Sequence, residues 1–227
     1  MLSNGASRGR EIRADIFMKN TTNGPRHKAC VVVFAKVPGL GIAKSRIAAT
    51  EGRERAEAIY RELLSVCADT VAAVPHYVAY TGADSPGELQ TIFPHGAGFF
   101  AQGGQGLGPR LKHAFGYLAA RGHRAICAIG ADCPQLTKDD ILNAFKEIEN
   151  GTDIVLGPAE DGGYYLVCTR PGCFSIFDSS RFQTEKLFED TMAIAGTKGY
   201  STAVLGMRND IDTIRDYRQW KKIIDTT

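Results

Sequence analysis

The loop that follows the first apolar run of the chain combines glycine with basic side chains. Residues 30–35 read Cys-Val-Val-Val-Phe-Ala, and Lys-Val-Pro-Gly-Leu-Gly-Ile-Ala-Lys-Ser-Arg follows at 36–46. Glycines allow backbone N–H groups to approach a phosphate closely, and Lys44 and Arg46 supply positive charge. We expect both cations to be exposed and to contact phosphate without shaping the fold, and we expect Lys44 to act in catalysis. The phosphate-binding residues predicted here are Lys36, Pro38, Gly39, Gly41, Lys44, Ser45 and Arg46.

Two familiar phosphate loops come close to this segment and do not fit it. A Walker A loop needs glycine immediately before its Lys-Ser pair, and Ala43 stands there. A dinucleotide fingerprint needs a small residue at the position of Lys44. A Gly-Pro turn with solvated charges is the commoner fate of such a string, but its place directly after a buried strand favours phosphate binding.

A second glycine-rich segment, 103–108, comes before an expected helix and Arg110. One interpretation is a flexible turn in which glycine only supplies positive φ. The other places the helix N-terminus and Arg110 beside a ligand anion, because the first backbone N–H groups of a helix attract negative charge. On the second interpretation, Gly106 and Arg110 join the phosphate-binding set.

Acidic residues lie beside two other expected elements. Asp132 follows the apolar run 125–129, where a carboxylate can hold a divalent metal against phosphates or merely cap a turn. Asp210 and Asp212 stand before the last expected helix, where they either form a second segment that supplies metal ligands or are solvated loop charges. The elements beside Asp132 and Asp212 are expected at one edge of the sheet. We therefore predict that these two carboxylates converge on one metal ion.

The segment 157–165 reads Gly-Pro-Ala-Glu-Asp-Gly-Gly-Tyr-Tyr and is first of all a turn signal. Tyrosine offers an apolar ring face and a hydroxyl, which suits a sugar or a small acceptor. Asp161 can accept hydrogen bonds from hydroxyl groups or act as a base toward an acceptor. We therefore predict Asp161 as a catalytic residue and Gly162, Gly163 and Tyr164 as acceptor contacts.

The composition is that of an ordinary globular chain. The chain has 227 residues and a net charge of +2, which gives no reason to expect nucleic acid or an anionic membrane as a partner. No run is long enough to span a membrane and no secretory signal is evident, so we expect a cytoplasmic protein. Its six cysteines lack paired C-x-x-C spacing, which argues for free thiols and against zinc. The composition predicts a disordered extension over 1–27, with Met18 as an alternative start, and one domain over 28–227.

From residue 28 onward, apolar runs alternate with amphipathic stretches. This alternation predicts a three-layer αβα domain with a mixed, mostly parallel sheet, whose ligand site lies outside the carboxyl ends of the strands. The link between 154–156 and 164–168 is too short for a helical crossover, so these strands cannot be parallel neighbours joined by one. Expected strands are 30–35, 77–80, 98–101, 125–129, 154–156, 164–168 and 201–205, and expected helices are 52–73, 86–92, 107–120, 184–195, 213–224 and one that begins at Thr137.

Five motifs in this order resemble a bacterial glycosyltransferase-like family, also described as radical-SAM/selenodomain-associated or arsenosugar-biosynthesis transferases. The resemblance covers about residues 29–222. It implies the GT-A fold of nucleotide-diphospho-sugar transferases and kinship with 2-phospholactate guanylyltransferase, whose first loop is similar to residues 43–46. The motifs are Phe34-Ala35-Lys36-x-Pro38-x-x-Gly41-x-x-Lys44-Ser45-Arg46, Gln105-Gly106-x-x-Gly108-x-Arg110-Leu111, Gly130-x-Asp132-Cys133-Pro134-x-Leu136-Thr137, Gly157-Pro158-Ala159-x-Asp161-Gly162-Gly163-Tyr164-Tyr165-Leu166 and Asp210-Ile211-Asp212-Thr213.

The same resemblance implies roles for individual residues. Asp132 and Asp212 fall where GT-A nucleotidyltransferases place their metal ligands, and Lys44 and Arg46 fall where they place phosphate contacts. The chain departs from many metal-dependent glycosyltransferases in one respect. A two-acid D-x-D pair is missing at Asp132, where Cys-Pro follows.

The motifs and the resemblance together predict a transferase with Mg²⁺ or Mn²⁺ as cofactor and with a nucleotide or nucleotide sugar and a small-molecule acceptor as partners. The favoured reaction moves a glycosyl group from a nucleotide-diphospho-sugar to the acceptor. One alternative is a guanylyltransferase-like nucleotidyltransferase that releases pyrophosphate, and another is a nucleotide-binding protein without turnover. The base, the sugar and the acceptor stay open, as does the oligomeric state, for which a homodimer is one option.

Overall fold

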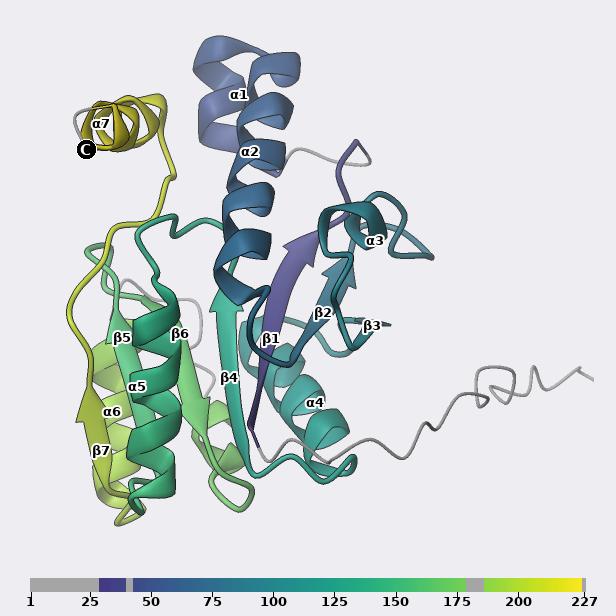
Figure 1. Cartoon of the computed structure of the whole chain (residues 1–227). Coiled ribbons are helices and arrows are strands. Elements are labelled where there is room, and N and C mark those ends of the chain that lie inside the picture. Colours follow the sequence, from purple (N-terminus) through teal and green to yellow (C-terminus); the bar gives the residue numbers. More distant parts are fainter. Residues whose placement is uncertain (1–28, 40–42, 179–185, 226–227) are drawn as a thin grey trace, which may run out of the picture.

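A seven-stranded sheet forms the centre of the structure, with the strand order β3-β2-β1-β4-β6-β5-β7 (Figure 1). The computed structural model describes residues 29–39, 43–178 and 186–225. The extension predicted for 1–27 and the phosphate contact predicted for Gly41 therefore lie outside the described residues. The strands are β1 (Ala29–Lys36), β2 (His76–Thr81), β3 (Gly98–Ala101), β4 (Ala125–Gly130), β5 (Ile154–Pro158), β6 (Tyr164–Thr169) and β7 (Thr202–Val204).

Strand β6 runs antiparallel to both of its neighbours, β4 and β5, whereas every other pairing in the sheet is parallel. The mostly parallel mixed sheet predicted from the sequence is confirmed. The two strands on either side of the short 159–163 link are antiparallel neighbours, in agreement with the argument from its length. The parallel strands β1 and β4 end at Lys36 and Gly130, so their carboxyl ends lie together at one edge of the sheet.

Helices cover both faces of this sheet. Buried side chains of α2 and α5 pack against one face and those of α4 and α6 against the other, and Figure 1 shows these two layers. The three layers follow from the continuous apolar runs of the central strands, which bury both faces. The helices are α1 (Ser45–Glu51), α2 (Arg53–Val71), α3 (Leu89–Ile92), α4 (Leu107–Ala119), α5 (Lys138–Glu149), α6 (Leu187–Thr197) and α7 (Ile214–Ile224), with a 3₁₀ turn at Phe174–Asp178.

A third apolar cluster lies beyond the carboxyl edge of the sheet, where α1, α2 and α7 meet. Figure 1 shows α1 and α7 above the ends of β1 and β4. The sequence predicts a loop through Arg46 and no helix before residue 52, so α1 is a difference from that expectation. Ile47 on α1 is fully buried in the cluster, and tertiary burial of this kind stabilises a helix too short to form alone.

Two predicted helix starts are confirmed by their hydrogen bonds. The Thr137 hydroxyl accepts from the backbone N–H of Asp140 at the start of α5, and the Thr213 hydroxyl accepts from that of Asp216 at the start of α7. In both cases the acid also accepts from the backbone N–H of the threonine, which completes a capping box.

All six cysteines are buried free thiols, as predicted. None of the helices in the described ranges combines the length and the apolar character that crossing a membrane would require.

Candidate functional site

The ammonium of Lys44 lies between two carboxylates at the carboxyl edge of the sheet. Lys44 Nζ donates to Asp132 Oδ2 at 3.0 Å and lies 3.9 Å from Asp212 Oδ1. Arg46 Nη1 reaches Asp212 Oδ2 at 3.2 Å from the other side. Four residues predicted from three separate motifs therefore form one charged cluster.

The backbone explains why these segments meet. Because β1 and β4 are parallel neighbours, the loops after their carboxyl ends start side by side. The segment 210–212 is tied to the same place, since the backbone N–H of Ile211 donates to the carbonyl of Asp132 at 2.8 Å. The Ile211 side chain is buried in the cluster of α1, α2 and α7. The two acids that flank Ile211 are thus anchored next to Asp132.

Lys44 is buried, with 5% of its surface exposed. The expectation that both loop cations are exposed is therefore wrong for Lys44, although it holds for Arg46, whose side chain is 71% exposed. Lys44 is the N-cap residue of α1, and its side chain contacts the carboxylates of Asp132 and Asp212. A cation buried in this way contributes to the stability of the folded state as well as to the binding of any ligand.

Asp210 belongs to the same cluster, although the sequence argument chose only Asp212 from this segment. Its Oδ1 atom is buried and has no hydrogen-bond partner among the described residues. Burial raises the pKa of Asp210 to about 7, and the charges of Asp132 and Asp161 add to the effect. The alternation Asp-Ile-Asp was the available signal, because a buried residue between two acids places both acids on the same side of an extended segment.

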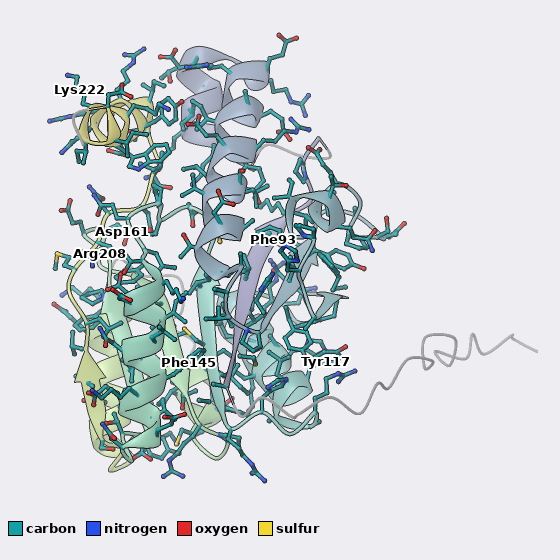
Figure 2. The ribbon with its side chains drawn as sticks, viewed as in Figure 1. Phe93, Tyr117, Phe145, Asp161, Arg208 and Lys222 are labelled. Atoms are coloured by element: carbon teal, nitrogen blue, oxygen red, sulfur yellow. The ribbon has the colours of Figure 1, made fainter. Side chains whose placement is uncertain are left out.

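Asp161 lies in the turn between β5 and β6, where its Oδ1 accepts from the backbone N–H of Gly163 at 2.9 Å. Figure 2 shows Asp161 and Arg208 at the same edge of the sheet, and the backbone N–H of Glu160 donates to the carbonyl of Arg208. Asp161 is exposed and close enough to Asp210 to raise its pKa. The predicted base Asp161 therefore borders the three acids Asp132, Asp210 and Asp212, which form an acid cluster.

The neighbouring acceptor residues are less free than the sequence suggests. The Gly162 carbonyl accepts from the backbone N–H of Phe188 near the start of α6. The Tyr164 hydroxyl is buried, and the Tyr165 hydroxyl donates to the carbonyl of Gly206 at 3.0 Å. The expectation that these tyrosines offer both ring and hydroxyl to a ligand is therefore wrong in part, since both hydroxyls are turned into the protein.

A first cavity of about 200 Å³ opens beside the Lys44–Asp132 pair. Three cations line it, namely Lys36, Lys44 and Arg110. It also receives Leu107 at the start of α4, so the N-terminus of that helix faces the cavity. Such an arrangement of cations and a helix N-terminus suits the phosphates of a nucleotide.

The geometry of Arg110 depends on a residue that the sequence argument missed. Arg110 Nη1 donates to Gln102 Oε1 at 3.4 Å and Arg110 Nε donates to the carbonyl of Gly104 at 3.3 Å. Gln102 Nε2 in turn donates to the carbonyl of Ala79 at 2.8 Å. A glutamine just after a short strand gives no sequence signal of this bridging role. Gly106 caps α4 with φ of 87°, a conformation that glycine adopts without strain.

Other members of the predicted phosphate loop lie outside this lining. Gly39 donates its backbone N–H to the carboxylate of Glu57, and Ser45 is exposed on α1. Pro38 is buried. Of the predicted site residues that the structure describes, Lys36, Lys44, Arg110 and Asp132 line the first cavity. The predicted phosphate contacts Pro38, Gly39, Ser45, Arg46 and Gly106 do not line it.

A second cavity of about 310 Å³ adjoins the first, since both are lined by Phe34, Leu107 and Asp132. Its wall comes from β4, β6 and α4. The remaining lining residues are Leu111, Ala128, Ile129, Gly130, Tyr164, Tyr165 and Val167.

The acid cluster fits a divalent metal that a ligand would complete. Within the described ranges, no three His, Cys, Asp or Glu side chains form a ready-made metal cage. Mg²⁺ is usually held by one or two carboxylates together with substrate phosphates, and cages built wholly from protein are not its habit. The buried, unpartnered Oδ1 atom of Asp210 and the neighbouring carboxylates of Asp132 and Asp212 supply oxygen ligands of that kind.

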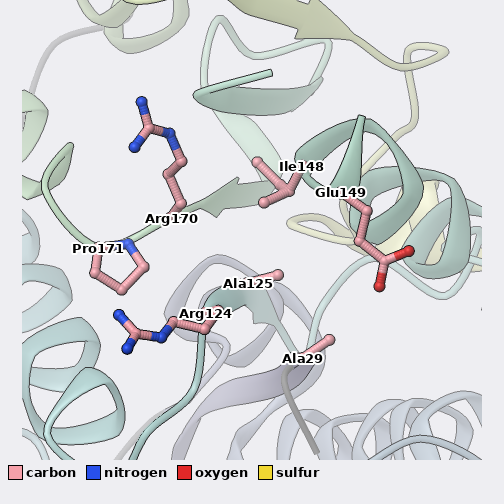
Figure 3. A pocket seen from close by; sticks show the side chains of 7 residues that line it. All are labelled: Ala29, Arg124, Ala125, Ile148, Glu149, Arg170 and Pro171. Carbon is pink, nitrogen blue, oxygen red and sulfur yellow. The ribbon is translucent and has the colours of Figure 1, made fainter. Parts of the chain in front are cut away.

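A third cavity, of about 280 Å³, lies at the opposite edge of the sheet, beside the start of β1 and β4 (Figure 3). Arg124, Glu149 and Arg170 line it, together with small and apolar side chains. Arg170 is ion-paired with Asp153. None of the predicted site residues lines this cavity, so the chemistry suggested by the sequence lies elsewhere.

The chain resembles known proteins in sequence and in fold. A family model described as "Uncharacterized protein conserved in bacteria (DUF2064)" matches residues 64–192. No curated protein matches the sequence. A protein of Desulfovibrio desulfuricans G20, provisionally described as a nucleotide-diphospho-sugar transferase, superposes with a TM-score of 0.78 at 27% identity, and the match covers 85% of this chain and 86% of that one.

Two more distant structures share the fold. CMP:2-keto-3-deoxy-manno-octonic acid synthetase complexed with CTP superposes with a TM-score of 0.56 at 12% identity, covering 88% of this chain and 99% of that one. Rv0371C of Mycobacterium tuberculosis H37Rv, in complex with manganese, superposes with a TM-score of 0.50 at 14% identity, covering 85% and 97%. The fold predicted from the sequence, an αβα domain like that of nucleotide-diphospho-sugar transferases, is confirmed.

Proposed function

The chain belongs to the DUF2064 family, and we propose that it is a divalent-metal-dependent transferase that takes a nucleotide-diphospho-sugar and glycosylates a small acceptor. The observation that carries this proposal is the ammonium of Lys44, held between Asp132 and Asp212 beside a cavity lined by further cations. Cations next to clustered acids suit a diphosphate and a metal ion together. The provisional description of the D. desulfuricans protein points to the same substrate class.

In this proposal the chain binds the donor through its diphosphate. Lys36, Lys44 and Arg110 and the N-terminus of α4 pair with phosphate oxygens in the first cavity. Asp132 and Asp212, with Asp210 beside them, hold Mg²⁺ or Mn²⁺. A bound metal ion of this kind neutralises charge on a departing diphosphate. The manganese complex of a protein with the same fold is in keeping with this assignment.

Glycosyl transfer then needs few groups from the protein. A hydroxyl oxygen of the acceptor bonds to the anomeric carbon while the bond from that carbon to the β-phosphate oxygen breaks. The bonding electron pair leaves with the nucleoside diphosphate, whose charge Lys44 and Arg110 stabilise. The acceptor proton passes to Asp161, the exposed carboxylate at the border of the acid cluster. Gly162, Gly163 and Tyr164 would line the approach of the acceptor.

The rival reaction is nucleotidyl transfer, in which an acceptor phosphate attacks the α-phosphorus of a nucleoside triphosphate. The shared fold with a synthetase in complex with CTP makes this reaction the natural alternative. Its acceptor would bring a phosphate beside Asp161 and Asp210, and like charges repel unless a metal ion intervenes. This repulsion favours the glycosyl reaction.

The products separate the two reactions. The protein is incubated with Mg²⁺ or Mn²⁺, nucleotide sugars, nucleoside triphosphates and a cell extract as the source of acceptors. Acceptor-dependent release of a nucleoside diphosphate from a sugar donor supports the proposal. Acceptor-dependent pyrophosphate, with no nucleoside diphosphate from any sugar donor, selects the rival. Asp132→Asn should abolish either product, whereas the matched change at an exposed acid of α5, Asp139→Asn, should leave it intact.

A further inference from the structure

Charge is distributed unequally between the two adjoining cavities. The first contains Lys36, Lys44 and Arg110. Among the described residues that line the second, Asp132 is the single charged side chain, and no lysine, arginine or histidine is present. The boundary between a cationic and an apolar compartment therefore falls at Asp132, which lines both.

Few polar side chains line the second cavity among the described residues. The Tyr165 hydroxyl donates to the carbonyl of Gly206, and the Tyr164 hydroxyl is buried with no hydrogen-bond partner among the described residues. The backbone of β4 is paired with β6 along the wall, where Ala128 faces Val167 in register. A sugar with several hydroxyl groups would find few hydrogen-bond partners here, and burying unpaired hydroxyls is costly. A phosphate would find no cation among the described lining residues to offset its desolvation.

We infer that the second cavity receives the acceptor and that this acceptor is an uncharged molecule with an apolar body and one nucleophilic hydroxyl. This inference rests on the proposed function, because it takes the first cavity as the donor site. The apolar body of the acceptor packs against Leu111, Ala128 and Val167. Its hydroxyl lies at the Asp132 end, where the two cavities meet. The sugar and phosphates of the donor stay on the cationic side of that boundary.

The test compares matched probes on the intact protein. The dissociation constants of 2-phenylethanol, of 2-phenylethyl phosphate and of glycerol are measured by NMR titration, with and without Mg²⁺ and a nucleoside diphosphate. The neutral aromatic alcohol should bind at least about tenfold more tightly than both other probes, because only it matches the lining. Tighter or equal binding of the phosphate ester or of glycerol would overturn the inference.

A variant places the binding in this cavity. Ala128→Val adds two methyl groups to a wall position that is 4% exposed, so thermal unfolding must first show that the variant is folded. It should weaken 2-phenylethanol binding about fivefold or more and leave the nucleotide dissociation constant unchanged. The matched control Ala203→Val, on the edge strand β7, should change neither. Unchanged 2-phenylethanol binding in Ala128→Val contradicts the assignment.

The two proposals can fail separately. A protein that binds no nucleotide under any metal condition refutes the proposed function, whatever the probes do. A protein that binds nucleotide with metal and yet prefers 2-phenylethyl phosphate refutes the acceptor class and leaves the metal-dependent nucleotide site standing.

Discussion

The ammonium of Lys44 donates a hydrogen bond of 3.0 Å to a carboxylate oxygen of Asp132, although 88 residues separate the two in the chain. The first lies just before α1 and the second just after β4. Their contact joins the loop that the sequence marks as phosphate-binding to the acid that it marks as metal-binding. Lys44 contacts both Asp132 and Asp212, and in the proposed function a diphosphate would compete with Asp132 for the same ammonium.

Removing Lys44 should therefore affect stability as well as binding. Lys44→Ala leaves Asp132 and Asp212 without their shared cation, and we expect the free energy of unfolding to fall by about 1–2 kcal/mol, reduced from the value for fully buried pairs because both acids are partly exposed. Arg46→Ala, at an exposed side chain, should change it by less than about 0.5 kcal/mol. Chemical denaturation and nucleotide titration check both. Equal stability of the two variants would show that Lys44 has no structural part.

A side chain at Gly130 should disturb the site by moving one carboxylate, and it should leave the fold intact. A Cβ atom at Gly130 would lie 2.5 Å from Asp132 Oδ1, so Gly130→Ala must displace that carboxylate. We expect loss of metal-dependent nucleotide binding. Gly116→Ala, on the exposed side of α4 with open space around it, should keep binding and stabilise the helix by about 0.5–1 kcal/mol. Normal binding by Gly130→Ala would mean that the position of Asp132 is unimportant.

The sequence predicts the sheet and most helices because apolar runs and helix caps are local signals. Strand β3 (Gly98–Ala101) lies where expected, and α5 and α7 begin just after Thr137 and Thr213, where their starts are expected. The sequence does not predict α1, whose stability comes from burying Ile47 against α2 and α7. That contact joins distant parts of the chain, and no local pattern announces it.

The site shows the same division between local and distant signals. The residue types beside the strand ends indicate phosphate and metal chemistry. Burial of Lys44, the unpaired oxygen of Asp210 and the bridge from Gln102 to Arg110 depend on which segments become neighbours. Choosing Asp212 without Asp210 was an omission of this kind, since only the fold reveals that Asp210 is the more enclosed acid.

Asp210 should make stability depend on pH. Its pKa is raised from 3.8 to about 7, so between these values the folded state keeps a proton that the unfolded state has released. In metal-free buffer the free energy of unfolding therefore falls as the pH rises through this window and levels off above it. Asp210→Asn should remove that fall. The free energy of unfolding of the variant, relative to that of the unmodified protein, should therefore rise from pH 4 to pH 7. Thermal unfolding across this range would contradict the account if the difference stayed constant.

Asp153 should act in the opposite sense, far from the site. The backbone N–H of Ser201 contributes most to lowering the pKa of Asp153, against the opposing effect of burial, and Arg170 adds to the lowering. Its contribution to stability is present above the unfolded pKa and is lost as the pH falls through the folded one. Asp153→Asn should cost about 1–3 kcal/mol at pH 7 and progressively less below pH 4. Asp139→Asn, at an exposed acid, is the control, and a deficit that does not shrink at all as the pH falls below 4 would count against the assignment.

The most direct test of the central claim is a thermal-unfolding panel of nucleoside triphosphates and nucleotide sugars, each with and without Mg²⁺ or Mn²⁺. A ligand at a hundred times its dissociation constant adds roughly 2.7 kcal/mol to the free energy of unfolding, which for a chain of this size raises Tm by about 5–10 °C. We predict such a rise with at least one nucleotide only when metal is present, its loss in Asp132→Asn and its retention in Asp139→Asn. No rise with any nucleotide, or the same rise in Asp132→Asn, would contradict a metal-dependent nucleotide site at this edge of the sheet.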